Sequence, residues 1–199
     1  TNLSHDHLDY HKNFKAYLSS KLYLFENLIK KNGTIITDSA IPQLKRIKKI
    51  AKKKKLNLKT IFGKNSDLEL VSHKFENESQ ILKIKYKKDF FILKLNLIGK
   101  IQVKNIFMAI LAAEKSDLNM KSIIKVINKI KPVEGRLEKI GNIKNNSKVI
   151  LDYAHTPDAL KTVLLNIKEQ FPSTKISLVF GCGGDRDKEK RSKMGKIAD

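Results

Sequence analysis

The most informative stretch of this 199-residue chain is VILDYAHTPDALKTVLLNIKEQFPSTKISLVFGCGGDRDKEKR, residues 149–191. It reads as strand, acidic turn, helix, strand and glycine loop, which is the order of a nucleotide-handling βαβ unit. Residues 149–151 form a short apolar run, and Asp152 follows where a buried parallel strand ends. Ligand-binding groups project from that end of an open α/β sheet. The stretch therefore predicts an α/β fold with a ligand at this edge.

The helix and the glycine loop of this stretch support the same prediction. Pro157 suits the first turn of a helix, and the residues after it place an apolar stripe on one face: Ala159, Leu160, Val163, Leu164 and Ile167. Residues 176–180 predict the second strand, which runs into Gly181-Cys182-Gly183-Gly184. Glycines let a backbone approach a ligand closely, and the next helix offers N–H groups to an anion. The glycine spacing matches no phosphate-loop motif and is unspecific by itself.

The charge of the chain favours no particular partner. The net charge is +21, but only four of the 41 basic residues are arginine, and the lysines are spread along the whole sequence. A nucleic-acid footprint is a patch rich in Arg and interleaved with aromatic residues, so we expect no nucleic-acid partner. A single cysteine, Cys182, excludes an internal disulfide. Because the sequence shows no apolar run of membrane length and no signal peptide, we expect a cytoplasmic protein without a membrane partner. We also expect a monomer.

The rest of the chain predicts a second α/β unit. Helices are expected at residues 13–31, 41–54, 103–115 and 120–130, strands at 34–38 and 58–62, and an antiparallel meander at 68–98. The Pro-Val-Glu-Gly-Arg segment at 132–136 breaks the helical pattern. We therefore predict domains at 1–136 and 137–199. The chain lacks an initial methionine and stops inside an expected helix, so we expect a fragment that is catalytically inactive alone.

Two pairs of strings in the sequence resemble the Mur ligases. They are DYAHTPDAL with FGCGGDRDKEKR, and DHLDYH with AYLSSKLYLF. The resemblance is to the branch that adds the third amino acid of the peptidoglycan stem peptide, the UDP-N-acetylmuramoyl-tripeptide synthetases. It implies the C-terminal part of a central ATP-binding domain, with a parallel sheet, helices and a small antiparallel meander. The start of a Rossmann-like C-terminal ligase domain is expected to follow.

This resemblance implies an ATP-dependent ligase with magnesium as its metal. The enzyme would join a diamino acid, meso-diaminopimelate or lysine, to UDP-N-acetylmuramoyl-L-alanyl-D-glutamate through an acyl phosphate. The phosphate-binding loop and the UDP-binding domain would lie upstream of Thr1. A folylpolyglutamate synthase-like ligase of the same superfamily and a basic nucleic-acid-binding module are the alternatives.

The residues predicted to hold the metal ion are His7 and Lys21. Lys21 falls on the apolar stripe of the first expected helix, where an amine must find a partner, lose its proton or be modified. In the family the matching Lys carries a carbamate and the matching His binds magnesium. The alternatives are a Lys21 that extends to solvent with His7 as a loop residue, or a zinc site with His11 and Asp9.

Five residues are predicted to bind the nucleotide. The segment at 99–105 is similar to the family's G-x-F-N-x-x-N, with Ile101 and Gln102 in place of Phe and Asn, so only its last Asn is carried over. That residue, Asn105, would approach the adenine, because an amide both donates and accepts. The resemblance places four more residues by the nucleotide: Arg136, Asp152, Tyr153 and His155. The alternative for Asn105 is a polar residue at a helix start, and for Asp152 a helix cap.

Arg186 is the expected substrate-binding residue. In relatives that add meso-diaminopimelate, the matching Arg contacts a carboxylate of that amino acid, and a guanidinium can bind a carboxylate through two hydrogen bonds. The alternative is an ion pair with the neighbouring Asp185 or Asp187.

Overall fold

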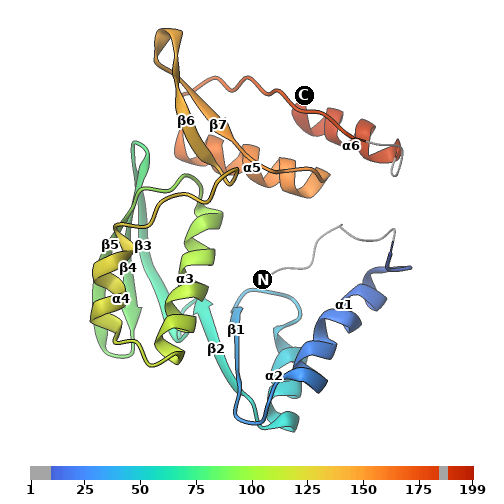
Figure 1. The fold of residues 1–199 in the computed structure, drawn as a ribbon, viewed down its shortest axis with the longest axis vertical. Helices are drawn as coiled ribbons and strands as arrows, with labels where there is room; N and C mark the ends of the chain where they lie inside the picture. Colours follow the sequence, from blue (N-terminus) through green and yellow to red (C-terminus); the bar gives the residue numbers. More distant parts are fainter. Residues whose placement is uncertain (1–9, 184–187) are drawn as a thin grey trace.

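The computed structural model describes residues 10–183 and 188–199. Three groups of elements follow one another along the chain (Figure 1): parallel strands with helices, an antiparallel meander with helices, and a β-hairpin with helices. The first two groups share one five-stranded sheet in the order β1-β2-β3-β4-β5. Within the described part of the chain, no helix combines the length and apolar character needed to cross a bilayer.

The first group confirms the helices and strands expected before residue 63. Its elements are α1 (Phe14–Tyr23), a π-helical turn (Leu24–Leu28), β1 (Thr34–Asp38), α2 (Leu44–Lys54) and β2 (Asn57–Phe62). β1 and β2 are parallel, with Thr34 beside Asn57 and Asp38 beside Ile61. Helices cover these strands because their apolar faces share a core made of Leu22, Ile35, Ile47, Ile50, Ala51 and Leu56. Asp38 thus ends a parallel strand at its carboxyl edge.

The second group is the predicted meander with its two helices. It comprises β3 (Leu68–Glu76), β4 (Ser79–Tyr86), β5 (Asp89–Leu95), α3 (Lys100–Lys115) and α4 (Met120–Ile127). β3 runs parallel to β2, whereas β4 and β5 are antiparallel to their neighbours. Phe107 of α3 is fully buried and its ring packs 5.3 Å from that of Phe62. The main core therefore fixes α3 against the sheet.

The third group differs in part from the expectation. It contains β6 (Glu138–Ile143), a short turn of 3-10 helix (Lys144–Asn146), β7 (Ser147–Leu151), α5 (Pro157–Gln170) and α6 (Lys188–Ala198). The strand expected at 149–151 is present as β7, but it pairs antiparallel with β6, a strand that the sequence analysis missed. The strand expected at 176–180 was wrong: this segment is irregular and Val179 is 97% exposed. A strand needs a hydrogen-bonded neighbour, and no described strand pairs with this segment.

Asp67 joins β2 to β3 through its carboxylate. Oδ1 accepts a hydrogen bond from Lys59 Nζ at 2.7 Å, and Oδ2 accepts one from the Thr60 N–H at 2.8 Å. Burial alone raises the pKa of this carboxyl, but the bonds from Lys59 and Thr60 outweigh that effect and lower the pKa below 3.8. The ionised form of Asp67 thus stabilises the fold.

We expect Asp67→Asn to lower the free energy of unfolding of the full-length protein by about 1–3 kcal/mol at pH 7. Because the folded pKa is depressed, the contribution of Asp67 is fully present above the unfolded value of 3.8 and is lost as the pH falls below it. Urea unfolding at pH 7 and in steps down to pH 3 measures this, with the exposed Asp89→Asn as control. Equal stability of the Asp67→Asn and unmodified proteins at pH 7 would contradict the prediction.

Candidate nucleotide site

Four of the five residues predicted to bind the nucleotide are linked by side-chain contacts, and Gln102 completes the link. Asn105 Nδ2 donates to Gln102 Oε1 at 3.3 Å, and Gln102 Nε2 donates to the carbonyl oxygen of Arg136 at 3.0 Å. The Arg136 guanidinium lies 4.9 Å from the centre of the Tyr153 ring, and the Tyr153 and His155 rings pack edge to face with their centres 5.1 Å apart. The contacts run from α3, across the 132–137 connection, to the start of α5.

Asp152, the fifth residue, adjoins the same place and holds two backbone segments together. Its Oδ2 accepts the Leu137 N–H at 2.9 Å, and its Oδ1 accepts the Ala154 N–H at 2.8 Å. The cap of α5 is Thr156, whose hydroxyl accepts the Ala159 N–H at 3.2 Å. The helix-cap alternative for Asp152 is therefore wrong. Each carboxylate oxygen keeps a second lone pair, so Asp152 can still accept from a ligand hydroxyl.

The exposed groups of this site suit an adenosine. Tyr153 is 63% exposed and its ring lies against a guanidinium, and the exposed Asn105 residue has an amide with both donor and acceptor atoms. Bases stack on aromatic and guanidinium planes, and an amide complements the donor and acceptor edge of adenine. The carboxylate of Asp152 is the group expected for ribose hydroxyls. The residues present therefore fit a nucleoside, and their roles toward it stay predictions.

Gln102 is the site residue that the sequence analysis left out. It replaces an Asn in the similar family segment, so no role was carried over to it. Its longer side chain spans the gap between Asn105 and the Arg136 carbonyl. A signal was available, because residues 102 and 105 are three apart and lie on one helix face.

An ion pair to a buried carboxylate fixes α3 next to Asn105. Lys104 Nζ donates to Asp38 Oδ2, and the Asp38 side chain is only 5% exposed. Asp38 Oδ1 also accepts the Ala40 N–H at 2.9 Å, while the Lys104 ammonium lies over the Phe62 ring. The end of β1 is thereby tied to the helix that carries Gln102 and Asn105.

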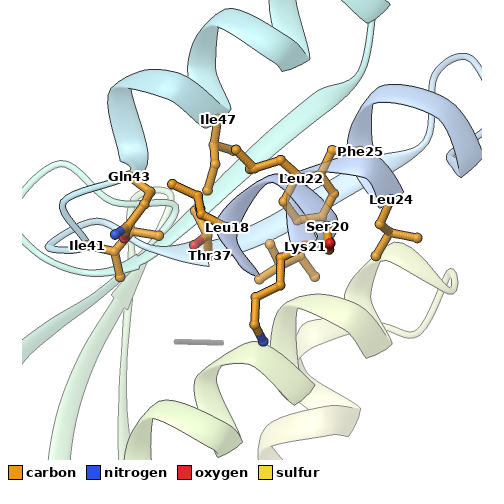
Figure 2. A pocket seen from close by; sticks show the side chains of 11 residues that line it. Leu18, Ser20, Lys21, Leu22, Leu24, Phe25, Thr37, Ile41, Gln43 and Ile47 are labelled. Atoms are coloured by element: carbon orange, nitrogen blue, oxygen red, sulfur yellow. The ribbon is translucent and has the colours of Figure 1, made fainter. Parts of the chain in front are cut away.

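Lys21 does not face the core, so the prediction that it lies on the apolar stripe of the first helix was wrong. The helix turns its Leu22 and Tyr17 inward and leaves Lys21 exposed, with the ammonium 4.8 Å from the centre of the Tyr17 ring. Lys21 lines a pocket of about 390 Å³ between α1, α2 and β1. Figure 2 shows its side chain extending away from the apolar side chains of that pocket. An exposed amine is accessible to CO₂, and carbamate formation at Lys21 stays a prediction.

The remaining predicted residues, His7 and Arg186, lie outside the described residues. Among residues 10–183 and 188–199, no group of three or more His, Cys, Asp or Glu side chains is arranged to hold a metal ion. The magnesium hypothesis for His7 and Lys21 and the carboxylate-binding role of Arg186 therefore remain predictions.

Comparison with known proteins gives matches over the whole chain. Residues 1–113 match the Mur ligase middle domain, and residues 135–199 match the Mur ligase glutamate ligase domain. A UDP-N-acetylmuramoyl-L-alanyl-D-glutamate–2,6-diaminopimelate ligase of Rickettsia montanensis is 35% identical over 199 residues, which are 100% of this chain and 40% of that protein. This chain thus spans well under half the length of that relative.

Solved structures share the fold. The structure of a UDP-N-acetylmuramoyl-L-alanyl-D-glutamate–2,6-diaminopimelate ligase superposes with a TM-score of 0.69 at 27% identity, over 98% of this chain and 40% of that one. MurF ligase from Thermotoga maritima, in complex with ADP, gives a TM-score of 0.70 at 18% identity, over 98% and 44%. The expected fold class is confirmed, and the chain belongs to the Mur ligase family.

Proposed function

We propose that the protein is an ATP-dependent amide-bond ligase that adds meso-diaminopimelate to UDP-N-acetylmuramoyl-L-alanyl-D-glutamate in peptidoglycan synthesis. The observation that carries the proposal is the set of contacts that brings Asn105, Arg136, Tyr153 and His155 together beside Asp152. The 35% identity to the Rickettsia ligase, named for the same substrates, supports the choice of reaction. The ADP in the related Thermotoga structure supports the choice of nucleotide.

Bound ATP would supply the phosphoryl group that turns the D-glutamate carboxylate into an acyl phosphate. The amine of the diamino acid would then attack the acyl carbon and displace phosphate. The part of this chain is to hold the adenosine: Asn105 at the base, Tyr153 and Arg136 at its face, and Asp152 at the ribose. Holding reactants in one orientation is a large part of catalysis for such a two-substrate step.

Three further assignments belong to this proposal. Magnesium would be held by His7 and by a carbamate on Lys21, and it would neutralise phosphate charge. Arg186 would bind a carboxylate of the incoming amino acid and would favour meso-diaminopimelate over lysine. The two domains would meet at Arg136, and the enzyme would act as a cytoplasmic monomer without nucleic-acid or membrane partners.

The test is an assay of the full-length protein with ATP, magnesium, the UDP-linked dipeptide and either diamino acid, read by mass spectrometry. We expect the tripeptide product with meso-diaminopimelate and phosphate release that requires all substrates. Formation of the lysine-containing product instead would change the assigned amino acid from meso-diaminopimelate to lysine. Turnover of a folate substrate, with none of the dipeptide, would replace the proposal with the folylpolyglutamate synthase alternative.

A further inference from the structure

Helix α3 begins without a cap of its own. The Gln102 N–H bonds back to the Gly99 carbonyl at 3.1 Å, but Gly99 at the N-cap position has no side chain to accept from the other N–H groups of the first turn. The acceptors come from α5 instead. Asn166 Oδ1 accepts the Ile101 N–H at 2.9 Å, and Gln170 Oε1 accepts the Gly99 N–H at 2.8 Å. Figure 1 shows α5 lying across this end of α3.

The bond to Gly99 is part of a buried polar network. Gln170 is 5% exposed, and its Nε2 donates to the Asn77 carbonyl in the β3–β4 turn at 3.1 Å. On the other side, the fully buried Gln80 donates to the carbonyls of Leu97 and Gly99 at 2.7 and 3.1 Å. The Gly99 backbone is therefore held by one glutamine from the middle domain and one from the glutamate ligase domain.

The capped helix is also the one that carries the nucleotide site. Gln102 and Asn105 lie within the first two turns of α3, directly after the N–H groups that α5 caps. Whatever frays the first turn of α3 displaces these two side chains. The cap comes from the other domain and its contacts are polar, which is typical of interfaces that can separate.

We propose that Asn166 and Gln170 are positioning residues that cap the nucleotide-binding helix only when the two domains are docked as seen here. Separation of the domains removes the cap and loosens the first turn of α3. Docking and nucleotide binding then strengthen each other by the same factor, because coupling between two binding events is reciprocal. The identity of the nucleotide rests on the proposed function, whereas the cap itself does not.

The test is hydrogen exchange in the full-length protein, with and without the ATP analogue AMP-PNP, on peptides that cover residues 97–105. We expect Asn166→Ala to speed exchange at the start of α3 and to weaken AMP-PNP binding, each by about tenfold, in line with the loss of a helix cap. Asn166→Asp keeps an acceptor oxygen and should restore both values, since an anion suits a helix N-terminus. Thr162→Ala is the matched control on α5, because the hydroxyl of Thr162 bonds within that helix.

The outcomes separate this inference from the proposed function. Unchanged exchange at 97–105 in Asn166→Ala would overturn the cap. Faster exchange with unchanged AMP-PNP affinity would overturn the coupling between the helix cap and nucleotide binding. Failure of the unmodified protein to bind AMP-PNP, with the exchange effect intact, would refute the proposed function and leave the cap standing.

Discussion

Gly99→Ala should lower the free energy of unfolding of the full-length protein by about 3–5 kcal/mol, combining backbone strain with overpacking. Gly99 has φ +87°, a conformation that side chains rarely adopt. An added Cβ would lie 2.5 Å from Leu137 Cδ1 and 3.2 Å from both Cβ and Oδ1 of Asn166. Leu137 is buried and cannot move aside easily. The substitution should therefore push α5 away from α3 as well as strain the backbone.

Gly135→Ala is the matched control for this effect. Gly135 also has a positive φ, +66°, but a Cβ there would meet nothing within 4 Å. The free energy of unfolding of the Gly135→Ala variant should fall by only about 1–2 kcal/mol, from backbone strain at the positive φ. Urea unfolding compares the two variants, and hydrogen exchange at 97–105 reports the loosened helix. Equal losses for the two variants would contradict the close packing at Gly99.

Asp152→Asn should reduce kcat/KM for ATP by about 100-fold, which corresponds to about 2.7 kcal/mol of transition-state binding. An amide offers one acceptor oxygen in place of two, so the N–H of Leu137 or of Ala154 would face a donor. Leu137 has φ +47° and depends on that bond. The charge offered to the ribose hydroxyls is lost as well. Steady-state kinetics with varied ATP measures the effect.

Glu134→Gln is the control for Asp152→Asn. It removes a nearby negative charge from an exposed position and should leave the kinetics unchanged. The melting temperature of each variant shows whether a fall in kcat/KM is caused by unfolding. If Asp152→Asn stayed folded with an unaltered kcat/KM for ATP, the role of Asp152 toward the nucleotide would be disproved.

Local patterns in the sequence predicted most of the fold. β1 has the expected bounds, and α2, β2, α3 and α4 lie where periodicity and Gly or Pro breaks indicated. β6 was missed because its sequence EKIGNI has little alternation. The sequence signal for this hairpin was the dipeptide Asn145-Asn146, because Asn favours tight hairpin turns. Both residues have positive φ in the structure. The expected strand at 176–180 failed because apolar composition cannot supply a neighbouring strand.

The residue types of the candidate site could be proposed from the sequence, whereas their contacts could not. The matched strings pointed to Asn105, Arg136, Asp152, Tyr153 and His155, but periodicity could not show that Gln102 joins α3 to the 132–137 connection. The helical stripe also misplaced Lys21. Its neighbour Leu22 takes the buried position, and the switch to a π-helical turn at Leu24–Leu28 ends the regular period. Contacts between distant segments were the part that the sequence did not reveal.

The most direct test is a crystal structure of the full-length protein with ADP. We expect adenine beside the Asn105 amide, the ring of Tyr153 or the Arg136 guanidinium against the nucleoside, and the ribose hydroxyls on Asp152. ADP bound elsewhere, with these side chains out of contact, would contradict the nucleotide site and the function drawn from it.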